Sequence, residues 1–231
     1  MISSSLDKRL LSCADYVRVG AVLADIGTDH GYLPIFLLGE GRISRAVLAD
    51  INEGPLSTAK ENVARLGLSH LCEFVLTDGA AALVDKGITD YAICGMGGEL
   101  IAEIITRAPH LMDGAVRLIL QPMSRQEHLR RELCRMGFSI IAERYSVAEG
   151  KRYVSICAEY TATPCEISDE IAYLGLGPSV EDDISAYLAY LTAKRDSIAK
   201  AAEARARAGI DDNLKDVVAL FDGRIGKYSK M

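Results

Sequence analysis

The sequence predicts an α/β fold: an open, mainly parallel sheet with helices on its faces, followed by a C-terminal pair of helices. Two observations carry this prediction. Short apolar runs alternate with helical patterns from residue 21 to about 136, and each run ends in polar or glycine-rich residues. From residue 184 onward apolar residues recur at helical spacing. In an open parallel sheet a ligand binds at the carboxyl edge, so the residues that follow each run are the candidate site.

The first half of the chain contains a leading helix and three strand-helix steps. Leu6, Leu10 and Cys13 recur at helical spacing, nearby serines can cap the start, and Gly20 can end the helix. Gly54 and Pro55 mark the beginning of a later helix. We therefore expect helices over 3–19, 32–38 and 54–66, with strands over 21–24, 45–49 and 73–76.

The second half continues the pattern and then changes character. We expect strands over 90–94 and 116–121, helices over 99–106 and 125–136, and a closing antiparallel pair over 138–145 and 153–160. Two amphipathic helices, one from residue 184 and one from residue 214, are separated by a turn at Gly209 and predict an antiparallel hairpin. The predicted domains are residues 1–163 and residues 164–231.

Composition limits the cellular setting. A chain of 231 residues can bury a full core. Its six cysteines contain no C-x-x-C pair, which predicts reduced core residues, and no stretch resembles a signal core or a membrane span. We therefore expect a cytoplasmic protein that does not enter a membrane.

Charge is distributed unevenly along the chain. Residues 1–183 hold 17 Lys and Arg against 26 Asp and Glu, a net charge of −9, whereas residues 184–231 hold 9 against 6, a net charge of +3. The tail is therefore where an anionic partner is expected to dock, although a basic helix face is commonly just solvated. The acidic first part slightly favours a small-molecule or protein substrate.

The loop after the first strand is the strongest local signal. Asp25, Gly27, Asp29 and Gly31 occupy alternate positions in the stretch ADIGTDHGYLP. Glycines let a backbone approach a ligand closely, and a carboxylate can accept hydrogen bonds from an ammonium group. Because Asp29 would repel a phosphate, the loop predicts a cationic ligand. The alternative is an ordinary strand-to-helix turn.

Three later strand ends support a nucleotide-like ligand. Asp50 lies 25 residues after Asp25, where the second strand of a dinucleotide-type fold places an acid on ribose hydroxyls. Asp78 ends the third strand, and both acids have a helix N-cap as their alternative role. Three glycines in the four residues 95–98 follow the fourth strand, which predicts that something approaches that backbone.

Six ordered motifs together resemble one family. The motifs are DIGTDHGYLP, DINEGPL, TDG, ICGMGGELI, LILQP and EGKRYVSI, and they span nearly the whole chain. They resemble the TrmK-type bacterial tRNA (adenine-N1)-methyltransferases, which act on adenine 22 of the D-arm. This resemblance implies a class I Rossmann-like domain that uses S-adenosylmethionine (SAM), followed by a coiled-coil-like helical domain that helps to hold tRNA.

The resemblance also assigns roles at matching positions. The residues expected to bind SAM are Asp25, Gly27, Asp29, Gly31, Asp50, Asn52, Asp78, Gly79, Gly95 and Met96. The residues expected to contact substrate are Arg9, Gly97, Gly98, Gln121, Pro122, Lys194 and Arg195. Asp29 is the candidate carboxylate for the cation that develops on the base, while His30 and Tyr32 are candidates for orienting or stacking on it. These three are the predicted catalytic residues.

Other interpretations remain open at this point. A nicotinamide-binding protein would also use Asp50, but the loop lacks G-x-G-x-x-G. A non-catalytic RNA-binding module would leave the loop and the strand-end acids without a role. A methyltransferase for a small molecule or a protein is the main alternative. For the favoured function we expect tRNA as partner, no metal, and a monomer or weak dimer.

Overall fold

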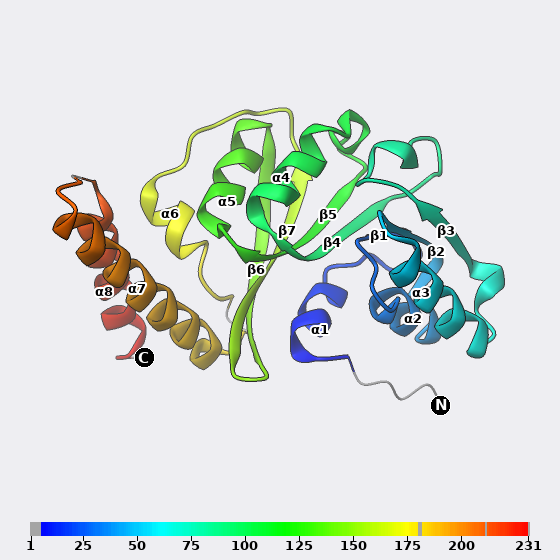
Figure 1. Cartoon of the computed structure of the whole chain (residues 1–231), viewed down its shortest axis with the longest axis horizontal. Helices are drawn as coiled ribbons and strands as arrows, with labels where there is room; N and C mark the ends of the chain where they lie inside the picture. Colours follow the sequence, from blue (N-terminus) through cyan, green and yellow to red (C-terminus); the bar gives the residue numbers. More distant parts are fainter. Residues whose placement is uncertain (1–5, 180–181, 211, 231) are drawn as a thin grey trace.

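The computed structural model describes residues 6–179, 182–210 and 212–230. Its centre is a seven-stranded sheet with the order β3-β2-β1-β4-β5-β7-β6 (Figure 1). The strands are β1 Ala21–Ile26, β2 Ile43–Asp50, β3 Cys72–Leu76, β4 Asp90–Gly97, β5 Arg117–Ser124, β6 Phe138–Ala148 and β7 Lys151–Tyr160. Strands β1 to β5 are parallel, and β7 runs antiparallel to both β5 and β6. The predicted parallel sheet with a closing hairpin is confirmed.

Helices cover both faces of this sheet. The helices are α1 Lys8–Ala14, α2 Tyr32–Gly39, α3 Glu53–Arg65, α4 Gly98–Thr106 and α5 Gln126–Arg135, with 3-10 turns η1 Ser69–Leu71, η2 Ala81–Leu83 and η3 Pro109–Leu111. One apolar core lies between α1, α2, α3 and the sheet, and a second lies between the other face and α4 and α5. Parallel strands buried on both faces explain the nearly continuous apolar runs in the sequence.

The leading helix is shorter than the sequence predicts. It spans Lys8 to Ala14, because the Asp7 side chain caps its start by accepting a hydrogen bond from the Leu10 amide at 2.7 Å. The serines expected to cap it, Ser3 to Ser5, lie outside the described residues. The extension toward Val19 was wrong, since residues 15–20 form turns that lead into β1.

Strands β4 and β5 are longer than predicted and include part of the glycine-rich segment. Gly97 pairs with Ser124, and the register shifts on either side of Met96. Gly95 has a φ of +79°, which permits that irregularity. Gly98 starts α4 and is buried; a Cβ there would overlap the Arg125 carbonyl and lie 2.9 Å from that of Ser124. The group that closely approaches the Gly98 backbone is therefore the backbone of Ser124 and Arg125 in the same chain.

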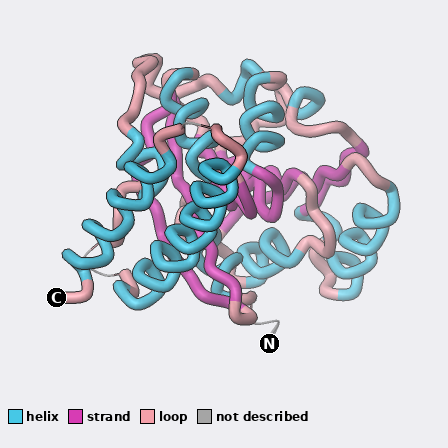
Figure 2. Tube along the Cα trace, turned by 60° about the vertical axis from the view of Figure 1, so that its left-hand side comes forward, coloured by secondary structure: helices cyan, strands magenta, loops and turns pink. Residues whose placement is uncertain are grey.

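The C-terminal part contains one helix that the sequence pattern did not reveal. Helix α6, Asp169–Leu174, is too short for helical periodicity and begins at a Ser168 cap. Helices α7, Ile184–Arg207, and α8, Leu214–Tyr228, run side by side (Figure 2), which confirms the predicted helical hairpin. Tyr187, Tyr190 and Leu191 of α7 are buried in the same core as α4, α5 and the sheet.

Two expectations from composition can also be compared with the structure. All six cysteines are free, and Cys13, Cys134 and Cys157 are buried. Cys165 is exposed, so its assignment to the core was wrong. Within the described ranges no helix is long and apolar enough to cross a membrane.

Candidate active site

A cavity of about 300 Å³ opens at the carboxyl ends of β1 and β4. Its lining comes from α1, the end of β1 with the loop that follows it, the start of α2 and the end of β4: Arg9, Leu10, Asp25, Gly27, Thr28, Asp29, His30, Gly31, Tyr32, Leu33, Cys94 and Gly95. Of these residues, the sequence had not indicated Leu10, Thr28, Leu33 and Cys94. Thr28, Leu33 and Cys94 lie inside motifs already singled out, whereas Leu10 required knowledge of how α1 packs on the sheet.

The loop after β1 is held by its own chain. The amides of Gly27 and Thr28 donate to the Ala49 carbonyl at 2.8 and 3.1 Å, which fastens the loop to β2. Gly27 has a φ of +73°, and a Cβ there would overlap the Met96 methyl group. Met96 therefore covers the loop from the β4 side. The glycine at position 27 is required by this contact and by the left-handed backbone.

Asp25 is the buried charge of the cavity. It is 8% exposed, and burial raises the pKa of its carboxyl to about 6. The Thr28 side chain and Arg9 oppose this rise, while the nearby Asp50 adds to it. Thr28 is itself buried and lines the same cavity. A buried ionisable group with a raised pKa in the lining of a cavity is typical of a ligand site.

Arg9 of α1 lines this cavity, and the side-chain amide of Gln121 connects it to strands β4 and β5. Its Nη1 donates to Gln121 Oε1 at 2.9 Å, and the Gly95 amide donates to the same oxygen at 3.1 Å. Gln121 is fully buried, and Pro122 is buried beside it. Both were predicted to contact substrate. Their burial instead indicates that Gln121 positions Arg9 and Gly95, while the Pro122 carbonyl accepts a hydrogen bond from Gln126 at 3.1 Å.

The predicted catalytic residues lie together at the mouth of the cavity. The Asp29 side chain is 75% exposed, and its Oδ2 lies 3.2 Å from His30 Nε2. The rings of His30 and Tyr32 are stacked, with centroids 5.0 Å apart and an interplanar angle of 27°. One carboxylate and two stacked rings therefore form an accessible rim.

The acids at the next two strand ends lie outside the cavity lining but on the same edge of the sheet. Asp50 Oδ1 accepts a hydrogen bond from the Asn52 amide at 2.7 Å, and among the described residues its Oδ2 has no partner. The exposed Asp78 forms an ion pair with Arg107 at 2.9 Å, and a Cβ added at the neighbouring Gly79 would lie 3.4 Å from the Ile104 side chain. Neither acid caps a helix, so the N-cap alternative was wrong for both.

Two predicted substrate contacts on α7 lie elsewhere. Lys194 lines a second cavity. Successive residues of a helix point about 100° apart, so Arg195 points away from the cavity that Lys194 lines. It forms an ion pair with Asp222 of α8 at 2.9 Å. The structure brings neither side chain to the first cavity.

An open sheet with an acidic, glycine-bearing cavity at its carboxyl edge defines a Rossmann-like nucleotide-ligand domain, and the comparisons narrow this class. The chain belongs to the methyltransferase domain family, whose model matches residues 6–156. It is similar to the tRNA (adenine(22)-N(1))-methyltransferase of Bacillus subtilis, with 38% identity over 155 residues. That match covers 67% of this chain and 65% of the relative.

Solved structures extend the similarity through the C-terminal helices. A Streptococcus pneumoniae protein, described as a candidate tRNA (m1A22) methyltransferase and solved with S-adenosyl-L-methionine, has 30% identity and a TM-score of 0.80. The alignment covers 96% of this chain and 100% of that one. The B. subtilis m1A22 tRNA methyltransferase TrmK has 28% identity and a TM-score of 0.79, with 98% of each chain covered. These findings confirm the resemblance that the six motifs predicted.

Proposed function

We propose that this protein transfers a methyl group from SAM to N1 of adenine 22 in the D-arm of tRNA. The observation that carries the proposal is the cavity at the ends of β1 and β4, with its buried Asp25 and its accessible rim of Asp29, His30 and Tyr32. Family membership and similarity to proteins named for this activity support the choice of reaction and substrate.

The residues of the cavity fit the amino-acid end of SAM. The ionised Asp25 carboxylate can accept hydrogen bonds from the ligand ammonium. Arg9, predicted from sequence to touch the substrate, lines this cavity and offers donors suited to a carboxylate. We assign the unpaired oxygen of Asp50 to the ribose hydroxyls. We assign Asp78 to the adenine, which it can bind once it has given up its ion pair with Arg107.

Methyl transfer in this site requires positioning and charge complementarity. SAM supplies a methyl group on a positively charged sulfur, which the adenine N1 lone pair attacks without prior loss of a proton. Asp29 faces the region where positive charge develops on the base, and the stacked rings of His30 and Tyr32 orient that base. Met96 and Gly97 form the wall on the β4 side. The target adenine must be unstacked to enter.

We further propose that the protein acts in the cytoplasm as a monomer or weak dimer and needs no metal. Among residues 6–179, 182–210 and 212–230, no group of three or more His, Cys, Asp or Glu side chains is placed to hold a metal ion. Residues 164–231 form the helical unit that follows the methyltransferase domain in this proposal.

The test is to map methylated nucleosides in tRNA incubated with the protein and labelled SAM. We expect 1-methyladenosine at position 22, and no product with tRNA that carries guanosine there. The Asp50→Ala variant is the negative control, because it lacks the proposed ribose acceptor. Label that enters a small molecule, a protein or another nucleotide would show that the substrate assignment is wrong.

A further inference from the structure

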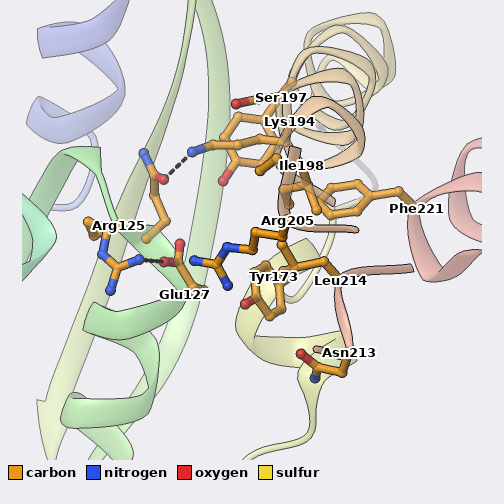
Figure 3. A pocket seen from close by; sticks show the side chains of 13 residues that line it. Arg125, Glu127, Tyr173, Lys194, Ser197, Ile198, Arg205, Asn213, Leu214 and Phe221 are labelled. Carbon is orange, nitrogen blue, oxygen red and sulfur yellow. Dashed lines mark hydrogen bonds and ion pairs between the residues drawn. The ribbon is translucent and has the colours of Figure 1, made fainter. Parts of the chain in front are cut away.

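A second cavity, of about 370 Å³, lies between the start of α5 and the α7–α8 hairpin (Figure 3). Three cationic residues line it, Arg125, Lys194 and Arg205, against one carboxylate, Glu127. The reaction proposed for the first cavity uses none of these residues. The excess of positive lining makes an anion the natural ligand.

Lys194 differs from the other two cations in its pairing. Arg125 contacts Glu99 at 2.9 Å and Glu127 at 3.2 Å, and Arg205 contacts Asp212 at 2.9 Å. Within the described part of the chain no carboxylate lies within ion-pair distance of the Lys194 ammonium. Its Nζ instead donates to the neutral Gln126 Oε1, the contact drawn as a dashed line from Lys194 in Figure 3.

The surroundings of Lys194 make this lack of a counter-charge costly. The side chain is partly buried, and its Nζ lies 6.0 Å from the centre of the Tyr190 ring. Burial and the nearby Arg130 lower the pKa of the ammonium, although Glu127 opposes this change. A cation removed from water without an anionic partner destabilises the folded state. A bound anion would supply the missing partner.

The start of α5 lies at the same cavity, because Arg125, Gln126 and Glu127 belong to its lining. Helix α5 begins at Gln126 without a side-chain cap, after Arg125 in a left-handed conformation with φ of 55°. An uncapped helix start adds free amide donors and a partial positive charge.

The second cavity also lies on the edge of the sheet where methyl transfer is proposed. Arg125 directly follows the end of β5, and β5 pairs with β4, whose Gly95 lines the first cavity. Gln126 connects the two regions through its hydrogen bond to the Pro122 carbonyl. The two cavities therefore lie beside the ends of neighbouring strands, on the same edge of the sheet, which is the arrangement that one nucleic-acid molecule needs to contact both.

From this arrangement we propose that the second cavity binds a phosphodiester group of the tRNA, held by Lys194 and the start of α5. This assignment rests on the proposed function for the choice of tRNA. The chemistry of the site, an anionic phosphoryl group on an ammonium and neutral donors, is independent of that choice.

The first experiment uses inorganic phosphate as the probe. Thermal unfolding is measured in phosphate and in chloride at equal ionic strength for the wild type, Lys194→Met and Lys200→Met. Lys200 is an exposed residue of the same helix, so its variant matches the charge change. Phosphate is expected to raise the melting temperature of the wild type and Lys200→Met more than that of Lys194→Met. In chloride, Lys194→Met should be at least as stable as the wild type.

Two results would overturn the anion site. The first is lower stability of Lys194→Met than of the wild type in chloride, which would mean that the Lys194 to Gln126 hydrogen bond serves the fold alone. Equal phosphate shifts in all three proteins would show only the general stabilisation by this salt.

The second experiment measures tRNA binding as a function of salt. At about 0.15 M salt, Lys194→Met should bind about fivefold more weakly, with the slope of log K against log salt reduced by about 0.7 to 0.9, the value for one lost phosphate contact. Lys200→Met should bind within about twofold of the wild type, and SAM affinity should stay unchanged in both. Unaltered tRNA binding by Lys194→Met would overturn the tRNA assignment. Failure of the proposed function would appear separately, as tRNA that binds but is not methylated at adenine 22.

Discussion

Asp25 combines burial with a ligand-facing position, and its ionisation should therefore control cofactor binding. Its pKa is raised to about 6 by burial. A ligand ammonium pairs with the ionised form, so lowering the pH from 7.5 to 5.5 removes the competent state and should weaken SAM binding about fourfold. Calorimetry across this range measures the effect.

The same shift predicts how the free protein responds to pH. Because the folded-state pKa lies above the unfolded value, the folded state binds the extra proton between about pH 4 and 6. The contribution of Asp25 to stability is therefore present at low pH and lost as the pH rises through 6. Asp25→Asn should remove the pH dependence of SAM affinity and this contribution to the pH dependence of stability. If SAM affinity of the variant still depended on pH, another group would be responsible for that dependence.

Asp29 lies at the mouth of the cavity, where two roles can be separated. If it stabilises the cation that develops on the base, Asp29→Asn should raise the activation free energy of methyl transfer by about 2 to 4 kcal/mol, with little change in SAM affinity. Single-turnover transfer at saturating tRNA, together with SAM titration, measures both quantities. Normal turnover, or a loss fully explained by SAM affinity, would leave Asp29 without a catalytic role.

Asp50 has an unpaired carboxylate oxygen on the strand beside the cavity. Asp50→Ala removes this acceptor and should weaken SAM binding by about 1.5 to 3 kcal/mol, the scale of a hydrogen bond to a charged group. Asp78→Ala is the matched comparison, because Asp78 is exposed and already paired with Arg107. We expect it to have the smaller effect. Unchanged affinity in a folded Asp50→Ala protein would contradict the ribose assignment.

At the scale of elements, α5 and β6 are joined by a buried ion pair. Arg130 Nε donates to Glu143 Oε1 at 2.6 Å, both side chains are fully buried, and Arg130 also donates to the Ala172 carbonyl of α6 at 2.7 Å. Arg130→Met leaves the Glu143 charge without its partner and should lower the free energy of unfolding by about 3 to 5 kcal/mol. Urea unfolding measures this loss.

A second substitution tests the reason for that loss. Glu143→Gln keeps an acceptor for the Tyr145 hydroxyl and the Leu176 amide, which both bond to Glu143 Oε2, but removes the charge. Combined with Arg130→Met it should recover part of the stability. If the double variant is as unstable as the sum of the two single variants, the unpaired charge is not the cause.

The order of strands and helices could be predicted because each element carries its own apolar pattern and the site residues follow strand ends in sequence. The roles of Gln121 and Gly98, and the cavity in which Lys194 lies, could not be predicted. Gln121 positions Arg9, which lies 112 residues away, and Gly98 is explained by the carbonyls of Ser124 and Arg125. Lys194 belongs to a cavity made by α5 and the hairpin. Such contacts depend on tertiary packing, which local spacing does not record.

For the whole molecule, the question is how the helical hairpin relates to the sheet. The sequence predicts a division between residues 163 and 164, and this boundary remains a prediction. Tyr187 and Tyr190 of α7 nevertheless pack against Tyr145 of β6, with ring centroids 4.5 and 5.0 Å away. We propose that residues 164–231 form a distinct helical unit that unfolds together with the sheet.

A single tryptophan can report on that cooperativity, because the chain has none. Tyr228 of α8 lies at the end of the hairpin, with its ring 5.3 Å from that of Tyr187, and Tyr228→Trp would place a fluorescent probe there. Phe74→Trp on β3 provides the matched probe at the opposite edge of the sheet. If the two parts share one cooperative core, both probes and circular dichroism should give the same midpoint in urea. SAM should then raise both midpoints equally, although its proposed cavity touches neither probe. A hairpin probe that changes at lower urea, with a midpoint insensitive to SAM, would instead mean that α7 and α8 unfold independently of the site.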